Sequence, residues 1–236
     1  MFSNSLISVI MSTYNSEETV KKSIESIISQ SYQNFELLII DDASTDSTLN
    51  KIQLYQEKYK NIRIYENKKN IGLTKCLNIL LEKTKGDYIA RQDDDDISIN
   101  TRLENQLKII KSKNLDFCTT RAITSPGGRS RPNLSFYLPQ KVLINYKNPF
   151  VHGTLMIKKN TITEIGGYDE NFYYSQDYKL MYDLIKKGYK FKTLREKLYI
   201  LNTENNLSEL KKKEQHYYAT CVKNKIKPEA IIWSYT

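Results

Sequence analysis

Four consecutive aspartates at residues 93–96 form the densest acidic point of a chain whose net charge is +9. They follow the short apolar run at residues 88–90, so they stand where a buried strand would end. Neighbouring carboxylates repel one another, and partial burial makes each charge more costly. A hard divalent cation bound by oxygen ligands would offset this repulsion. The run therefore predicts a metal site, and a solvated acidic turn that caps the next helix is the alternative.

A second acidic pair, Asp41 and Asp42, follows the nearly continuous apolar run at residues 35–40. Continuous apolar character is typical of a strand covered on both faces, as in a parallel sheet. The first apolar run, residues 8–13, likewise ends in polar side chains. Because ligands bind at the carboxyl ends of parallel strands, these polar groups are expected to meet in one crevice. Turn and capping chemistry is an equally good interpretation of the Asp41–Asp42 pair.

Strands and helices must alternate to bring these groups together. Apolar residues at helical spacing follow each apolar run, with short polar turns between them. This rhythm predicts an α/β layer with a mostly parallel sheet. Asn15 or Ser16, with Glu18, is expected to cap the first helix. The predicted strands are 8–13, 35–40, 62–65 and 88–90, and the predicted helices are 20–28, 49–59, 73–81 and 103–110.

The second half of the chain is less regular. Residues 115–119, 154–157 and 189–200 are predicted as strands, the last as one strand or two. The Gly- and Pro-rich stretch at residues 125–132 is expected to be a flexible loop. Gln176 and Asp177 open a helix, and residues 209–225 form a charged one.

Composition limits the class of protein. A chain of 236 residues with 39% hydrophobic and 27% charged residues fits one large domain, or one domain with a tail. No run approaches the length of a membrane span, and the start has no signal-peptide pattern. Three isolated cysteines indicate a reducing, cytoplasmic compartment. With only two histidines, any metal is expected to sit on oxygen ligands.

Positive charge is concentrated near the C-terminus. Residues 179–227 hold 13 Lys and Arg against 5 Asp and Glu. This basic part could contact anionic lipid as a peripheral protein at the inner face of the membrane, and a solvated helical surface is the alternative. Nucleic acid is not expected as a partner, because no nucleic-acid-binding motif is visible.

The chain resembles the inverting glycosyltransferases of family 2, which have the GT-A fold and include bacterial enzymes of surface-polysaccharide synthesis. The resemblance covers roughly residues 6–205, and five pieces in the order of the family carry it. They are the opening strand 8–15, the acidic turn 39–46, the strand and DxD-like run 86–96, the acceptor-side pieces 152–154 and 166–169, and the base motif 175–178.

The resemblance implies a GT-A domain over residues 1–205, with a nucleotide-sugar half at about 1–115 and a smaller, mixed acceptor half at about 116–205. A basic helical tail would follow at 206–236. The implied reaction is inverting transfer from a nucleotide-diphosphate sugar, most simply a UDP-sugar, to a hydroxyl of a glycan or glycolipid acceptor. Mn²⁺ or Mg²⁺ would be the cofactor.

The resemblance also assigns roles residue by residue. Asp177 would be the general base and Asp95 the metal ligand, although four aspartates in a row allow the ligand to lie one position away. His152 and Gln176 would lie on the acceptor side. The implied nucleotide-sugar contacts are Thr13, Asn15, Glu17, Asp42 for the uracil or ribose, Asp93 for the ribose or sugar, and Asp94.

Two positions depart from the family pattern. Gln176 stands where many relatives have Glu, and Leu77 where many have Arg. A non-catalytic domain that binds nucleotide sugars or polyanions is one alternative. A sugar nucleotidyltransferase is another, but residues 13–18 are acidic and Gly-free where that class has a basic Gly-rich loop. Lys75 and Arg102 could approach phosphate, but on helices they are expected more often as surface charges or partners of nearby aspartates.

Overall fold

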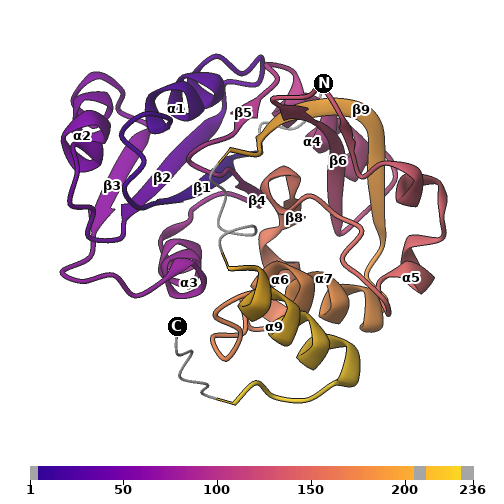
Figure 1. The fold of residues 1–236 in the computed structure, drawn as a ribbon. Coiled ribbons are helices and arrows are strands. Elements are labelled where there is room, and N and C mark those ends of the chain that lie inside the picture. Colours follow the sequence, from indigo (N-terminus) through magenta and orange to yellow (C-terminus); the bar gives the residue numbers. More distant parts are fainter. Residues whose placement is uncertain (1–4, 205–210, 230–236) are drawn as a thin grey trace.

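Strands and helices alternate through the first half of the protein (Figure 1). The structure is a computed structural model, and it describes residues 5–204 and 211–229. The elements of this half are β1 (Ile7–Thr13), α1 (Val20–Ile28), β2 (Phe35–Asp41), α2 (Thr48–Lys58), β3 (Ile62–Glu66), α3 (Leu73–Lys83), β4 (Tyr88–Arg91), β5 (Ile97–Ser98) and α4 (Arg102–Ser112).

The second half mixes longer strands with short helical turns and ends in a long helix. Its elements are β6 (Phe117–Ser125), β7 (Ser130–Arg131), the 3₁₀ turn η1 (Leu134–Tyr137), α5 (Gln140–Leu143), the 3₁₀ turn η2 (His152–Thr154), β8 (Met156–Lys158), α6 (Lys159–Glu164), α7 (Gln176–Lys186), β9 (Phe191–Asn202) and α9 (Lys212–Asn224).

One sheet runs through both halves in the order β3-β2-β1-β4-β8-β6-β9-β5. The strands β3, β2, β1 and β4 are parallel, whereas β8 is antiparallel to both of its neighbours. β9 runs parallel to β6, and β5 runs antiparallel to β9. The predicted mostly parallel sheet of the first half and the mixed sheet of the second half are confirmed. Thr13 pairs with Asp41, so the first two polar strand ends lie side by side.

Both faces of the sheet are covered (Figure 1). Side chains alternate along β1, so that Val9 and Met11 join the core under α1, α2 and α4. Ile10 points to the opposite core, under α3, α6 and α7. This arrangement explains the continuous apolar runs, because every position of such a strand meets a helix layer.

Two local predictions are wrong. No side chain caps α1, which begins only at Val20, and the Asn15 side chain is used elsewhere, as described below. The stretch 125–132 is a tight hairpin rather than a flexible loop. The Thr124 N–H donates to the Arg129 carbonyl at 2.9 Å, and the short β7 pairs with β6. The turn residues were identified correctly, but the strands on either side continue into them.

The basic helix α9 packs on the rest of the protein. Cys221 and Val222 are buried in the core under α7, and the Ser175 hydroxyl donates to the Gln215 carbonyl at 3.0 Å. The predicted helix 209–225 is confirmed over 212–224, and residues 209 and 210 lie outside the described part of the chain. The predicted boundary between domain and tail, at residues 205 and 206, and residues 230–236 also lie outside it. Within residues 5–204 and 211–229, none of the helices has the length and apolar character needed to cross a bilayer.

Candidate functional site

The loops that follow β1 and β2 are tied together by predicted site residues. The Asn15 side-chain oxygen accepts the Thr45 N–H at 2.8 Å, and the Asn15 N–H donates to the Ser44 hydroxyl at 2.9 Å. Glu17 accepts the Ser47 N–H at 3.2 Å. Asn15 has φ 51°, a left-handed conformation that Asn tolerates better than most residues. The two loops therefore form one rigid edge at the carboxyl ends of β1 and β2.

Asp42 fixes a third loop against this edge. It is 2% exposed and accepts the Ile71 N–H at 2.9 Å, the Gly72 N–H at 2.8 Å and the Asn67 side-chain amide at 2.8 Å. The structure thus shows Asp42 organising the segment 67–72, while its contact with a nucleotide stays a prediction. A Cβ on Gly72 would lie 2.5 Å from the Tyr173 ring, so this glycine lets the ring sit close to the loop.

Gln92 organises the aspartate loop from beneath. It is fully buried, and its amide nitrogen donates to the carbonyls of Asp93 and Asp96, each at 3.0 Å. Its amide oxygen accepts the Ser98 hydroxyl at 2.6 Å. Gln92 thus satisfies backbone carbonyls on the buried side of the loop and holds the loop in place.

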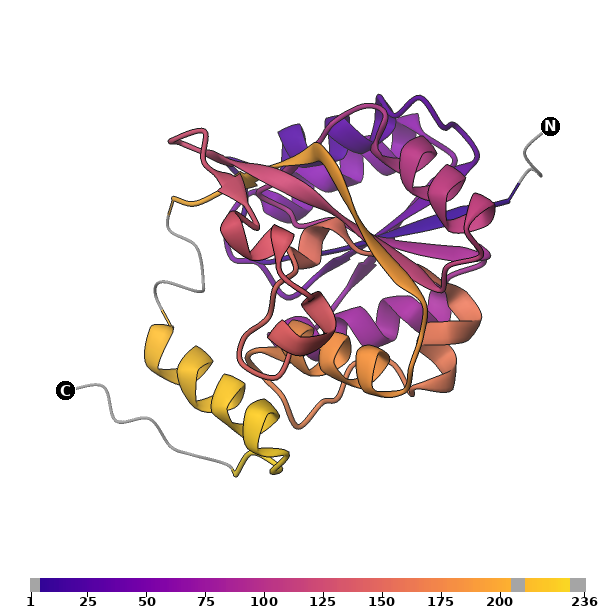
Figure 2. The same cartoon turned by 90° about the vertical axis from the view of Figure 1, so that its right-hand side faces the viewer.

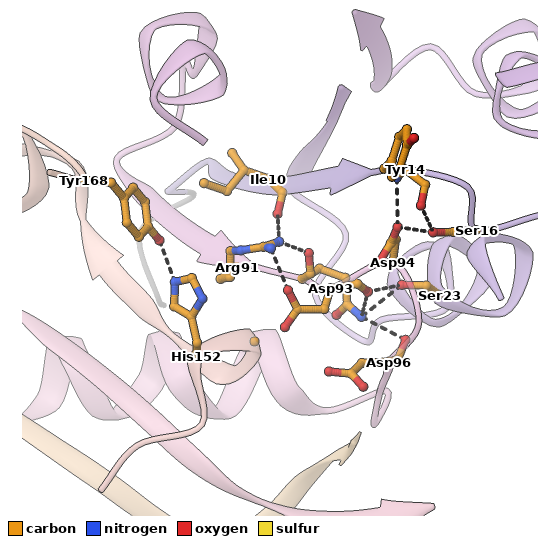
Figure 3. Close-up of polar contacts among 12 residues, drawn as sticks. Ile10, Tyr14, Ser16, Ser23, Arg91, Asp93, Asp94, Asp96, His152 and Tyr168 are labelled. Atoms are coloured by element: carbon orange, nitrogen blue, oxygen red, sulfur yellow. Dashed lines mark hydrogen bonds and ion pairs between the residues drawn. The ribbon is translucent and has the colours of Figure 1, made fainter. Parts of the chain in front are cut away.

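The first two aspartates of the loop have close partners (Figure 3). Asp93 is paired with the buried Arg91 guanidinium at 2.5 Å. Asp94 accepts a hydrogen bond from the Ser16 hydroxyl and one from the Tyr14 N–H at 3.4 Å. Asp94 therefore connects the aspartate loop to the loop after β1, as the predicted convergence of strand ends requires.

The last two aspartates meet the end of β9. The Asn202 N–H donates to Asp96 at 2.6 Å, and the Asn202 side-chain amide reaches Asp95 at 3.5 Å. Asp96 is 2% exposed, whereas Asp95 is partly exposed, and among the described residues the long contact with Asn202 is its only hydrogen bond to another residue. Asp95 is thus the member of the run whose oxygens are least committed to other groups.

Burial and mutual repulsion raise the pKa values of this loop. Burial, with repulsion from Asp93 and Asp94, raises the pKa of Asp95 to about 7. Burial, with repulsion from Asp93 and Asp95, raises the pKa of Asp96 to about 9. Burial also raises the pKa of Asp94. A carboxylate that is costly to ionise, next to others, fits a site that gains from a bound cation.

The residues present fit a divalent cation that receives some of its ligands from the protein and the others from a second molecule. Asp95 offers carboxylate oxygens that are only weakly hydrogen-bonded, and carboxylate oxygens are the ligands that Mg²⁺ and Mn²⁺ prefer. Within residues 5–204 and 211–229, no group of three or more His, Cys, Asp or Glu side chains is arranged to hold a metal by itself. Such a site would therefore need oxygens from water or from a bound diphosphate to complete the coordination.

Arg102 is not the surface charge that its helix position suggested. It is fully buried at the start of α4 and donates to the Gly153 carbonyl at 3.3 Å and to the Gln92 side chain at 3.4 Å. Its guanidinium lies 5.5 Å from the Tyr199 ring centroid, and burial lowers the pKa of Arg102 to about 10. Lys75, by contrast, is exposed on α3. Arg102 supports the aspartate loop because Gln92 and Gly153 both contact that loop.

Gly153 is required by the close packing around Asp93. A Cβ at this position would clash with the Tyr199 hydroxyl and lie 2.5 Å from the Asp93 carboxylate. Tyr199 cannot move aside easily, because it is fully buried and its hydroxyl accepts the Asp93 N–H at 3.1 Å.

We therefore expect Gly153→Ala to destabilise the protein by about 1–3 kcal/mol, as overpacked sites do, and to weaken donor binding by displacing Asp93. Urea unfolding and calorimetry with a nucleotide diphosphate measure the two effects. Gly188→Ala is the control, since Gly188 has φ +85° but no atom near its would-be Cβ. Its strain should lower stability without changing donor binding. Unchanged stability and binding in Gly153→Ala would show that the loop tolerates the displacement.

Asp177 lies in the first turn of α7, as predicted. The Asn148 side-chain amide donates to its Oδ2 at 2.7 Å. From Asn148 the chain runs to His152, whose Nε2 is hydrogen-bonded to the Tyr168 hydroxyl at 2.8 Å (Figure 3). Burial, and then the positive charge of Arg91, lower the pKa of His152, while the nearby Asp177 and Asp93 oppose this shift. His152 is therefore a neutral, hydrogen-bonded group located between the base candidate and the aspartate loop.

Asp177 lines a cavity of about 300 Å³ that lies between the segment 146–148 and helix α9. Gln176, in contrast, is buried and is not among the residues that line this cavity. The lining is rich in positive and aromatic groups. It consists of Tyr146, Lys147, Asn148, Ser175, Asp177, Tyr178, Gln215, His216, Ala219 and Lys223.

The residues that hold the predicted site residues in position were not identified from the sequence. Gln92 and Arg91 could have been suspected, because polar residues between a buried strand and a carboxylate run need partners. Tyr199 and Asn202 carry no local signal, since they reach the loop from a strand more than a hundred residues away in the chain. Asn148 and Gly153 likewise gain their meaning only from the fold.

Comparison of the sequence with known proteins shows the family of the chain. Residues 8–178 match the model of the family described as Glycosyl transferase family 2. The chain belongs to glycosyl transferase family 2. This glycosyltransferase is 35% identical over 215 residues to the protein EpsE of Bacillus subtilis, with 87% of this chain and 76% of EpsE covered.

The family 2 glycosyltransferase is also similar to WfaP of Escherichia coli, named as a UDP-Glc:alpha-D-GlcNAc-diphosphoundecaprenol beta-1,3-glucosyltransferase. The two are 30% identical over 200 residues, covering 78% of this chain and 72% of WfaP. Among solved structures, the mannosyltransferase PcManGT of Pyrobaculum calidifontis, in complex with GDP-Man and Mn²⁺, aligns with TM-score 0.77 and 18% identity. The alignment covers 93% of this chain and 63% of that one, and it supports the GT-A fold.

Proposed function

We propose that this glycosyltransferase carries out a metal-dependent, inverting transfer of a sugar from a UDP-sugar to a hydroxyl of a glycan or glycolipid. The observation that carries the proposal is the segment 148–153. At one end Asn148 is hydrogen-bonded to Asp177, and at the other Gly153 packs against Asp93. A base candidate and an acidic, cation-fitting loop are therefore joined through six residues, and His152 between them feels the charges of both Asp177 and Asp93. This arrangement supports a donor and an acceptor that meet in one reaction.

The donor would lie along the carboxyl ends of β1, β2 and β4. Thr13, Asn15 and Glu17 would line the nucleotide pocket, with Asp42 and the segment it holds on the uracil or ribose side. Asp93 and Asp94 would contact the ribose or sugar. The exposed rings of Tyr14 and Tyr173 lie close to this edge, and the pKa of Tyr173 is raised by burial and by Asp42. Such rings can stack on a base.

Asp95 would hold Mn²⁺ or Mg²⁺. When bound, the ion would supply Lewis-acid stabilisation of the charge that develops on the leaving diphosphate. Arg91 fixes the Asp93 carboxylate by its 2.5 Å ion pair, so Asp93 would meet the ribose or sugar in one orientation. The PcManGT complex, which contains GDP-Man and Mn²⁺, supports this part of the proposal by fold analogy.

Asp177 would remove the proton from the acceptor hydroxyl as that oxygen attacks the anomeric carbon. Asn148 donates to Oδ2, which leaves Oδ1 as the oxygen that accepts the proton. A single displacement from the face opposite the diphosphate inverts the anomeric configuration and needs only one such base. His152, being neutral and bonded to Tyr168, would position the acceptor side rather than take the proton.

The acceptor is proposed to be a glycan or a glycolipid of surface-polysaccharide synthesis. WfaP, whose name gives a diphosphoundecaprenol-linked acceptor, supports this choice. The lysines of the cavity beside Asp177 suit an acceptor that carries phosphate. Peripheral contact of the basic C-terminal part with the inner face of the membrane belongs to the same proposal, with Lys212 and Lys213 exposed on α9.

Thermal unfolding with a panel of nucleotides tests the proposed donor. UDP and one or more UDP-sugars should raise the unfolding temperature with Mn²⁺ and much less with chelator, because a ligand stabilises the state it binds. GDP-Man and CDP are the matched controls for the base. Stabilisation by every nucleotide alike, with no effect of metal, would favour a polyanion-binding domain. Binding of UDP-sugars without any turnover would favour a non-catalytic binding domain.

A further inference from the structure

Exposed apolar side chains are concentrated in one short part of the acceptor half. Nine large hydrophobic residues are exposed in the described chain, and five of them fall within residues 134–146. Water-facing apolar residues gathered in this way mark an interaction site more often than scattered ones do. The five are Leu134 at 76% exposure, Tyr137 at 64%, Leu138 at 52%, Val142 at 57% and Tyr146 at 68%.

The same part of the chain carries only positive charge. Residues 117–163 contain seven Lys and Arg and no Asp or Glu, in a chain that has 27 acidic residues. Within this stretch we define the docking segment as residues 129–147. Its four cations are all exposed: Arg129, Arg131, Lys141 and Lys147.

A groove of about 430 Å³ lies along the docking segment. Phe136, Leu138 and Pro139 form its apolar wall, and Lys141 and Lys192 stand among its lining residues. The Arg121 guanidinium is stacked 5.0 Å from the Phe136 ring and helps to hold that wall. Apolar walls with lysines beside them suit an amphipathic anion, since lysine stems can cover apolar surface while their ammonium groups reach a phosphate.

We propose that the docking segment binds the surface of an anionic lipid bilayer. Its exposed Leu, Val and Tyr side chains insert among the headgroups, and its cations, with no carboxylate between them, contact lipid phosphates. α5 and the segment that leads into it lie on the face turned to the viewer in Figure 2, free of cover by α9. This surface lies in the acceptor half and does not include the exposed Lys212 and Lys213 of α9.

The docking segment reaches the site already described. Tyr146 and Lys147 belong both to the segment and to the cavity that contains Asp177. A bilayer bound here would present a lipid-linked hydroxyl to that cavity without the lipid leaving the membrane. This consequence rests on the proposed function, whereas binding to the bilayer does not.

Flotation of the full chain with vesicles tests the proposal. We expect binding to phosphatidylcholine vesicles that contain phosphatidylglycerol, little binding to phosphatidylcholine alone, and weaker binding as salt is raised. Leu134→Ser with Tyr137→Ser, and separately Arg129→Glu with Lys141→Glu, should each weaken binding about tenfold. The matched controls are Leu54→Ser, which changes a 65% exposed leucine on α2, and Lys58→Glu with Lys60→Glu. Both should bind like the parent.

Three results would overturn the proposal. The docking variants could bind vesicles like the parent, or only Lys212→Glu with Lys213→Glu could lose binding, which would move the contact to α9. The parent could also form a dimer that Leu134→Ser with Tyr137→Ser dissociates, with no vesicle binding, which would make the surface an interface between copies. Hydrolysis of UDP-sugars without vesicles should be equal in parent and docking variants. Its absence from all of them would count against the proposed function and leave the vesicle result intact.

Discussion

Asp177→Asn is expected to lower the rate of sugar transfer by about 10²–10⁴, the usual contribution of a positioned general base. The substitution keeps the shape of the side chain, and its amide oxygen can still accept the hydrogen bond from Asn148. Only the ability to take a proton is lost. The loss should therefore appear in kcat, with the affinity for donor and metal nearly unchanged, since those contacts are assigned to the aspartate loop and the β1 and β2 edges.

Asp183→Asn is the matched control, because it makes the same change on the same helix. Asp183 lies two turns further along α7 and is bonded to Lys179 at 2.5 Å, not to the cavity. It should transfer sugar at the rate of the parent. If Asp177→Asn instead kept that rate, the base would have to be sought at Asp169 or Glu170 in the turn before α7.

Asp95→Asn is expected to reduce metal-dependent binding of UDP by roughly 10²-fold, because charge stabilisation by a bound metal is worth several kcal/mol. In this variant the affinity measured with Mn²⁺ should approach the affinity measured with chelator. Isothermal calorimetry in both conditions gives the two values. Equal affinity of the parent protein with and without metal would show that Asp95 does not hold a metal that binds UDP.

The pH dependence of this binding follows from the raised pKa. With its pKa at about 7, Asp95 is mostly protonated at about pH 6, and the proton competes with the metal. The affinity for Mn²⁺ should therefore rise between about pH 6 and about pH 8 in the parent and change less in Asp95→Asn. The sign is opposite for metal-free stability. Because folding raises this pKa, the unfolded chain binds fewer protons, and stability falls as pH rises from about 4 to about 7.

Asp96→Asn is the control that tests which aspartate holds the metal. The pKa of Asp96 is about 9, so the group is protonated at neutral pH and an amide is a close replacement. Its oxygen can still accept the Asn202 N–H. Metal-dependent binding at neutral pH should stay near that of the parent. If Asp96→Asn lost it while Asp95→Asn kept it, the ligand would lie one position further along the run.

The alternating strands and helices of the first half could be predicted because the sequence patterns that indicate them are local. Apolar runs of β length followed by helical spacing fixed the order of elements, and parallel pairing then placed Thr13 beside Asp41 and the aspartate loop next to them. The acidic runs at strand ends pointed to the same edge that the structure shows. Asp177 in the first turn of a helix was also readable from its neighbours.

What could not be predicted depends on partners far away in the chain. Arg102 and Lys75 are both helix cations in the sequence, and only the packing of α4 under the aspartate loop makes one of them buried. The contacts of Asp93 with Tyr199 and of Asp177 with Asn148 join segments whose positions follow from the whole fold. Asn is a residue type that often caps helices, but the side-chain oxygen of Asn15 instead accepts a hydrogen bond from Thr45 in the neighbouring loop.

Metal-dependent, inverting sugar transfer is tested by the release of UDP from a panel of UDP-sugars with a glycan or glycolipid acceptor, together with NMR assignment of the new linkage. We expect turnover that requires Mn²⁺ or Mg²⁺, is nearly lost in Asp177→Asn, and converts an α-linked donor into a β-linked product. Retained configuration, or turnover that is equal with metal and with chelator, would contradict this expectation.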